Sequence, residues 1–215
     1  MTEAVSIERD GADVAREALE RCIGAGGVAL FPADTVYGLA CDPLDAAAAR
    51  RVDELKGREP GKPSAVMFFS PLGMRELIGE LGPRTRHALA RLLPGPVTLV
   101  VANPNCHYPL ACGASVGPLG LRLIAGPLSG ARCAVLQTSA NLTGEPPPRA
   151  LAEVDEDIRS AVDIEIDAGE LPGTASTVLD LSEIDSGGGW RVLREGRLTV
   201  ADVERALGSD GQDAG

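Results

Sequence analysis

Aromatic residues are scarce in this sequence: Phe, Tyr and Trp together make up 3% of its 215 residues. The core must therefore be built from Val, Leu, Ile and Ala, and stacking of many aromatic side chains on nucleic-acid bases is not expected. A basic excess is also lacking, since 20 Lys and Arg stand against 31 Asp and Glu, for a net charge of -11. This balance argues against a protein that coats DNA, but it leaves room for a local basic pocket.

Long apolar runs and paired cysteines are missing as well. The longest apolar stretches, such as Val97 to Ala102, have the length of a strand, and residues 1–10 hold no apolar run, so neither a membrane span nor a signal peptide is expected. The five cysteines form no C-x-x-C pair, and the spacing of Cys106, His107 and Cys112 is wrong for structural zinc. We therefore predict a soluble cytoplasmic protein with reduced thiols and no metal site.

Several catalytic motifs are absent too. The sequence has no P-loop, because Gly61 and Lys62 are followed by Pro63, and it has no G-x-S-x-G nucleophile elbow. The only histidines are His87, in a predicted surface helix, and His107, in a Pro-rich loop. A His-dependent triad is therefore not expected, and neither histidine is predicted to be catalytic.

What the sequence does contain is an alternation of helix-like and strand-like segments, which predicts an α/β domain with a mixed sheet. Helices are predicted, from apolar spacing and capping residues, over residues 14–24, 46–55, 71–78, 83–92, 149–161 and 200–207. Strands are predicted over residues 27–31, 64–69, 97–102, 119–124, 133–137, 162–166, 176–181 and 190–193.

Three cations fall within seven residues between a predicted helix and a predicted strand: Lys56, Arg58 and Lys62. The glycines and prolines among them forbid a continuing helix, so the segment is a loop, and its charges suit a polyphosphate. Alternatively, Lys56 complements the carboxyl end of its own helix and the others are solvated. On composition alone, the second interpretation is the better one.

Small polar residues follow or open several predicted strands. Ser139 and Asn141 come after one strand, at the kind of edge where open α/β sheets bind ligands, although ordinary turn chemistry also uses these residues. Thr35 follows the strand that Pro32 stops. Arg122 is a cation inside an apolar run, so it must face solvent or an anion.

Taken in order, seven stretches resemble the YrdC-domain family of threonylcarbamoyl-AMP synthases, in its short bacterial form. Each stretch is modest alone, but seven in sequence order argue against chance. They are PADTVYGLACDP (32–43), KGREPGKP (56–63), PGPVTLV (94–100), LGLRL (119–123), TSANLTGEPPP (138–148), STVLDL (176–181) and LREG (193–196).

The resemblance implies a YrdC-like twisted sheet of parallel and antiparallel strands with flanking helices around a basic concave cavity, over residues 1–208, and we expect a disordered tail over 209–215. It implies a nucleotidyltransferase that makes threonylcarbamoyl-AMP and pyrophosphate from L-threonine, bicarbonate or CO2, and ATP, which would carry Mg2+. The product would go to a tRNA threonylcarbamoyl transferase complex, and some family members also bind RNA. No membrane partner is implied.

Matching the family motifs residue by residue gives the expected site. Lys56 and Arg58 match catalytic positions. The positions around the threonine are Thr35, Arg122, Gln137 and Ser176, and those that contact the nucleotide are Arg58, Lys62, Ser139, Asn141 and Arg194. We expect Lys56→Ala or Arg58→Ala to abolish turnover with little loss of stability, because a solvated loop carries little of it.

The sequence also departs from the family pattern. Ala33 stands where the family usually has Thr, Met67 stands where some members have His, and the His that often follows the strand of Arg122 is missing. These departures leave room for a YciO-like paralogue that binds nucleotide or RNA with little synthase activity. A carbamoyl-transferring relative acting on another small acceptor is a further alternative.

Overall fold

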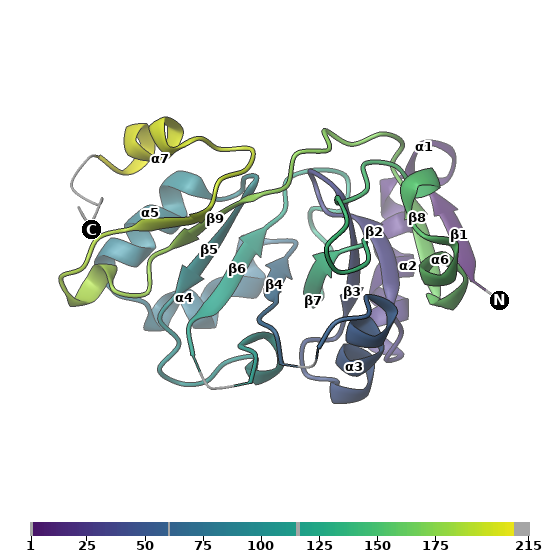
Figure 1. Ribbon diagram of the computed structural model, residues 1–215, viewed down its shortest axis with the longest axis horizontal. Helices are drawn as coiled ribbons and strands as arrows, with labels where there is room; N and C mark the ends of the chain where they lie inside the picture. The colour runs from purple at the N-terminus through teal and green to yellow at the C-terminus, as the bar shows by residue number, and fades with distance from the viewer. Residues whose placement is uncertain (1, 60, 115–116, 209–215) are drawn as a thin grey trace.

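The computed structural model describes residues 2–59, 61–114 and 117–208, and its strands form one mixed sheet of ten. Figure 1 shows them crossing the molecule from β1, near the N-terminus, to β9 on the opposite side. In chain order the strands are β1 (Glu3–Ser6), β2 (Ala29–Pro32), β3 (Tyr37–Cys41), β4 (Ala65–Phe68), β5 (Val97–Val101), β6 (Leu119–Leu123), β7 (Ala134–Ser139), β8 (Ile164–Asp167), β9 (Thr177–Asp180) and β10 (Arg191–Arg194).

Helices flank this sheet. The α-helices are α1 (Ile7–Asp10), α2 (Ala12–Gly24), α3 (Ala46–Leu55), α4 (Arg75–Glu80), α5 (Pro83–Leu92), α6 (Glu156–Ala161) and α7 (Val200–Leu207). Short 3-10 turns are η1 (Pro71–Met74), η2 (Pro109–Ala111), η3 (Leu151–Glu153) and η4 (Ile184–Ser186). A capping residue explains where α3 begins, because the Asp45 carboxylate accepts from the backbone N–H groups of Ala47 and Ala48.

The strand order is β1-β8-β2-β3-β7-β4-β6-β5-β9-β10. Parallel pairs join β1 to β8, β2 to β8, β4 to β6 and β5 to β9, while the other neighbours are antiparallel. The centre of the sheet therefore brings β3, β7, β4 and β6 side by side. β3, β6 and the end of β7 lie in three of the seven motif stretches, and β4 follows shortly after the stretch over 56–63.

Two apolar clusters pack on opposite faces of this sheet. In the first, Val52 of α3 and Leu89 of α5 join Leu121 of β6. In the second, Leu19 of α2 joins Phe31 of β2 and Met67 of β4, and Figure 1 shows α2 beside β2. Because side chains alternate across a strand, any residue between two members of the first cluster must point to the other face.

The predicted fold class, a mixed sheet with flanking helices, is confirmed. The helix predicted over 149–161 is wrong in its first half: Val154 is extended and the Asp155 carboxylate caps a new start, so only α6 is α-helical. β1, α1 and β3 were not predicted: β1 and α1 are only four residues long and carry charged side chains, and β3 follows directly on the loop that begins at Pro32. The tail predicted over 209–215 lies outside the described residues.

Candidate functional site

Polar side chains of three central strands share the sheet face opposite the first cluster. Leu121 and Leu123 of β6 pack into that cluster, so Arg122 between them points away from it. By the same alternation Gln137 of β7 and Thr98 of β5 lie on Arg122's face. All three polar residues are buried. This face therefore holds a buried guanidinium, an amide and a hydroxyl, and we take it as the floor of the candidate site.

Lys56 begins the polar edge of the site. It follows the last residue of α3, yet its ammonium does not turn back onto that helix. Instead it donates to the backbone carbonyls of Ser139, in a short contact, and of Asn141, at 2.6 Å. Only 5% of the residue is exposed. Burial and the nearby Arg58 charge lower the pKa of Lys56 to about 8, against an opposing effect of Asp53.

The environment of Lys56 overturns an assumption made from the sequence. Within the described ranges it has no carboxylate in ion-pair contact, and it is not a solvated loop residue. An ammonium has three N–H donors, so two are used by the carbonyls and one is left. A buried cation without an anionic partner is unfavourable by itself, and an incoming anion would relieve that cost.

Arg58 lies beside Lys56 on the loop that follows α3. Its guanidinium donates to the Ser64 hydroxyl at 3.0 Å and the Pro63 carbonyl at 2.6 Å, and Asp53 lies 3.9 Å away. About 10% of the side chain is exposed. Burial lowers the pKa of Arg58, and Asp53 opposes that shift. Asp53 was not singled out from the sequence; its place on the last turns of α3, just before Lys56, is the signal that could have identified it.

The loop of Arg58 rests on the segment between β5 and β6. Ala114 donates its backbone N–H to the carbonyl of Gly61 at 2.8 Å, and Ser64 donates to the carbonyl of Ala111 at 2.9 Å. The Cβ of any residue other than glycine at 113 would lie 2.7 Å from the Gly61 carbonyl oxygen. The two loops are therefore in close backbone contact, and each restricts the other.

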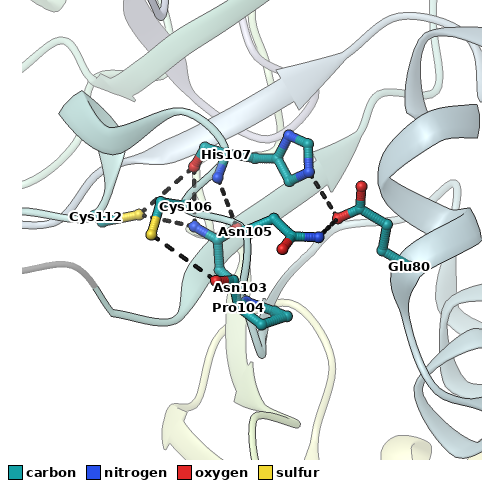
Figure 2. Close-up of polar contacts among 7 residues, drawn as sticks. All are labelled: Glu80, Asn103, Pro104, Asn105, Cys106, His107 and Cys112. Carbon is teal, nitrogen blue, oxygen red and sulfur yellow. Dashed lines mark hydrogen bonds and ion pairs between the residues drawn. The ribbon is translucent and has the colours of Figure 1, made fainter.

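Figure 2 shows how the β5–β6 segment is itself held. Glu80, from α4, accepts from the Asn105 amide at 2.8 Å and contacts His107 Nε2 at 2.7 Å. Asn103 donates to the His107 carbonyl at 2.9 Å and accepts from the His107 backbone N–H at the same distance. These contacts hold His107 on the loop between β5 and β6.

Asn141 fixes the turn that receives Lys56. Its amide nitrogen donates to the carbonyls of Leu142 and Glu145, each at 2.8 Å. Its Oδ1 atom is buried and has no donor among the described residues. Thr143 donates back to the Lys56 carbonyl from both its backbone N–H and its hydroxyl, each at 3.0 Å. The turn after β7 and the end of α3 are thus joined in both directions.

Arg122 is paired with a carboxylate that the site prediction omitted. One terminal nitrogen donates to Asp34 Oδ1 at 2.6 Å and to the Ala33 carbonyl at 3.2 Å. The side chains are 4% and 11% exposed. Burial raises the pKa of Asp34, and Arg122 opposes that shift. Asp34 stands in the same motif as the predicted Thr35, and its carboxylate complements the charge of the predicted Arg122. That complementarity is the signal that could have identified Asp34.

Arg194, the last residue of β10, contacts Ser176, the residue before β9. The Arg194 guanidinium donates to the Ser176 carbonyl at 2.8 Å, and the Ser176 hydroxyl lies 3.2 Å from that of Thr98. Desolvation lowers the pKa of Arg194, and the charge of Arg122 adds to this shift. Arg194 and Arg122 are therefore close enough to repel, which an anion between them would counter.

The structure gathers most of the residues predicted from the sequence. Lys56, Arg58, Ser139 and Asn141 form one group, and Arg122, Ser176, Arg194 and Thr35 form another. Gln137 is buried on β7, on Arg122's face.

Lys62 is the exception. Its side chain is 47% exposed, and it contacts the exposed Glu59 at 3.7 Å. None of the contacts found for the described residues joins Lys62 to either group.

Among the described residues there is neither a metal-binding cluster nor a membrane-spanning helix. No group of three His, Cys, Asp or Glu side chains there is placed to hold a metal ion. No helix among these residues has both the length and the apolar character needed to cross a membrane.

A mixed α/β sheet that carries buried cations and small polar groups defines a class of protein suited to holding an anion. The chain belongs to the Sua5/YciO/YrdC family: the family model, described as "Telomere recombination", matches residues 21–196. The resemblance inferred from the seven motifs is therefore confirmed.

Named relatives agree with this family. The threonylcarbamoyl-AMP synthase of Xanthomonas axonopodis pv. citri is 30% identical over 187 residues, covering 82% of this chain and 97% of that protein. The threonylcarbamoyl-AMP synthase of Pyrococcus abyssi is 30% identical over 194 residues, covering 86% of this chain and 55% of that protein. The chain thus spans about half of the archaeal relative and nearly all of the bacterial one.

Solved structures give the same picture. Sua5 of P. abyssi complexed with L-threonine matches with a TM-score of 0.82 and 29% identity, over 97% of this chain and 61% of that one. YciO of E. coli matches with a TM-score of 0.77 at 20% identity, over 94% of this chain and 98% of that one, which is evidence for the fold alone. The curated relatives carry the synthase name, so the YciO-like alternative is not favoured.

Proposed function

We propose that this protein is a nucleotidyltransferase that makes L-threonylcarbamoyl-AMP and pyrophosphate from L-threonine, bicarbonate or CO2, and ATP. The observation that supports this most strongly is the setting of Lys56. It is a buried cation bonded only to backbone carbonyls among the described residues, with Arg58 beside it, in a protein whose net charge is -11. An acidic protein that concentrates two buried cations in one place is equipped to bind a polyanion such as a triphosphate.

The chemistry needs no covalent attachment to the protein. The neutral amine of threonine attacks CO2, a C–N bond forms, and the ammonium proton is released to solvent, giving a carbamate. A carbamate oxygen then attacks the α-phosphorus of ATP, and the bond to the β-phosphate oxygen breaks, releasing pyrophosphate. Such steps depend on alignment of the reactants and on charge stabilisation, which fixed cations supply.

Each group of side chains has its own part in this scheme. Lys56 and Arg58 hold the phosphates, while Ser139, Asn141 and Arg194 contact the nucleotide, with Lys62 adding attraction from the rim. Around the threonine lie Thr35, Arg122, Gln137 and Ser176. Asn141 Oδ1, a buried acceptor without a donor among the described residues, is free to receive an N–H of the nucleotide. Mg2+ enters with the triphosphate as part of the substrate.

The product is a mixed anhydride of the type that a transferase can use. In this proposal it passes to a tRNA threonylcarbamoyl transferase complex. RNA, which some family members also bind, would meet the exposed Lys62 rather than the buried Lys56 and Arg58. We place the reaction in the cytoplasm, where ATP and tRNA are found.

Release of pyrophosphate tests the proposal. Purified protein with ATP, Mg2+ and bicarbonate should release pyrophosphate only when L-threonine is added, and mass spectrometry should find threonylcarbamoyl-AMP in the same mixture. L-Serine in place of L-threonine is the matched control for the amino acid. Release that does not depend on threonine, or no release at all, would refute the proposal.

A further inference from the structure

The ion pair between Asp34 and Arg122 engages a single nitrogen of the guanidinium. Both contacts to residues 33 and 34 use the same terminal nitrogen of Arg122, at 2.6 and 3.2 Å. The Nε atom of Arg122 is buried and has no acceptor among the described residues. A guanidinium is a planar fork of five N–H donors, so holding one end of it sets the direction of the rest.

Asp34 itself is held in an unusual backbone conformation. Its φ is +65°, in the left-handed region that residues other than glycine, asparagine and aspartate seldom adopt. The neighbouring backbone is fixed, because Thr35 donates to the Ala33 carbonyl at 2.9 Å and Gly173 donates to the Thr35 carbonyl at 2.9 Å. The chain thus accepts backbone strain at the residue that reaches Arg122, and such strain gathers at functional sites.

A second buried polar atom near this pair also lacks a partner. Thr35 follows Asp34 directly, and its Oγ1 atom is buried without a hydrogen-bond partner in the described ranges. Buried polar groups are nearly always paired, so these two unpaired atoms, one on the residue after Asp34 and one on its ion-pair partner, indicate that a ligand completes them. A hydroxyl and a guanidinium N–H together suit a carboxylate, since both can donate to its oxygens.

We propose that Asp34 is a positioning residue: it fixes the guanidinium of Arg122 so that the Nε edge meets the carboxylate of the amino-acid substrate. This role rests on the proposed function and adds a residue that it does not include. Asp34 does not touch the substrate in this account. It acts only through Arg122, so its loss should weaken amino-acid binding and leave ATP binding alone.

Two substitutions of Asp34 distinguish the loss of its contact with Arg122 from a change in its backbone conformation. Asp34→Gly removes the carboxylate and adopts a φ of +65° without strain, so it isolates the loss of the anchor. Asp34→Asn keeps both the left-handed conformation and an acceptor oxygen but loses the charge. Cys106→Gly is the matched control for added chain flexibility, because Cys106 is exposed, has a φ of +57°, and lies on the β5–β6 loop.

Kinetics of threonine-dependent pyrophosphate release give the readout. We expect Asp34→Gly to raise the KM for L-threonine roughly tenfold, the loss typical of one charge-assisted hydrogen bond, with the KM for ATP unchanged. Asp34→Asn should recover most of that loss, and Cys106→Gly should match the unmodified protein. In an Arg122→Gln background, Asp34→Gly should add little, because the group it positions is gone.

Several results would overturn this role. An Asp34→Gly protein with an unchanged KM for L-threonine, or with both KM values raised together, would show that Asp34 does not act through substrate carboxylate binding. So would an undiminished effect in the Arg122→Gln background. If the unmodified protein releases no pyrophosphate with L-threonine, the proposed function fails and this role fails with it. A melting temperature for each variant distinguishes lost binding from lost fold.

Discussion

Lys56 donates to the backbone carbonyl of Asn141 at 2.6 Å, from the end of α3 to the turn after β7. Two motifs separated by more than eighty residues therefore meet through one side chain. The carbonyl of Ser139 accepts from the same ammonium. Lys56 thus holds the turn after β7 in place and keeps a positive charge next to that turn. Both roles have measurable consequences.

Loss of Lys56 should destabilise the protein, contrary to the expectation from sequence. In Lys56→Met the carbonyls of Ser139 and Asn141 lose this donor, and an unsatisfied group costs about 1–3 kcal/mol. At neutral pH the variant also avoids the cost of burying a charged ammonium, which offsets part of this loss of stability. The folded-state pKa is about 8 and the ordinary value is 10.5, so the unmodified protein gains stability as pH rises between them. Chemical denaturation should show a larger loss at pH 9.5 than at pH 7.

The matched variant for that experiment is Lys62→Met, which removes a lysine from an exposed position six residues away. Its unfolding free energy should stay close to that of the unmodified protein at both pH values. Equal losses in the two variants would contradict the anchoring contact.

The pH dependence of activity should reveal the same lysine. kcat/KM for ATP reports the free protein, so it should fall as pH rises through about 8, where burial and Arg58 place the pKa of Lys56. A bound triphosphate favours the charged ammonium, so kcat should hold to higher pH than kcat/KM. Lys56→Arg, which stays charged in this range, should lose this fall in its residual activity. A flat kcat/KM from pH 7 to 9.5 would be inconsistent with a cationic Lys56 at the phosphates.

Arg58 and Lys62 should differ in their effect on ATP binding. Arg58→Gln removes a largely buried cation next to Lys56, and we expect the KM for ATP to rise at least tenfold. Lys62→Gln removes an exposed charge, for which we expect about a two- to threefold rise that fades in high salt. Titrations at two ionic strengths distinguish the cases. A larger effect for Lys62 would reverse the assignment of the phosphate contacts.

The histidines should be dispensable for turnover. His107 contacts Glu80 on the loop shown in Figure 2, and His87 lies on α5. We expect His107→Ala and His87→Ala each to keep kcat/KM within about twofold of the unmodified protein, as substitutions away from the reacting groups usually do. An inactive but folded variant of either would require a general acid or base that this mechanism lacks.

Some features of the fold follow from local sequence signals. Asp45 before an apolar helix, Pro83 at the first turn of α5 and the apolar run of β5 all produced elements with nearly the expected bounds. β3 escaped notice because its residues read as the end of a loop that begins at Pro32. It becomes a strand through its pairing with β2 and β7, which no local pattern encodes.

The cations of the candidate site could be predicted from the sequence, but the groups that they contact could not. Arg122 was conspicuous as a charge inside an apolar strand, whereas its contact with Asp34 depends on a left-handed turn and on the sheet order. The contact of Lys56 with the β7 turn likewise joins residues distant in sequence, so composition favoured a solvated loop. The sequence identified the charged residues, and the tertiary arrangement determines which of them are buried.

The most direct test of the whole account is a crystal structure with a non-hydrolysable ATP analogue and L-threonine bound together. We expect phosphate oxygens within hydrogen-bond distance of Lys56 and Arg58, and the threonine carboxylate on Arg122. Ligands bound on another face of the sheet, with Lys56 and Arg122 untouched, would contradict it.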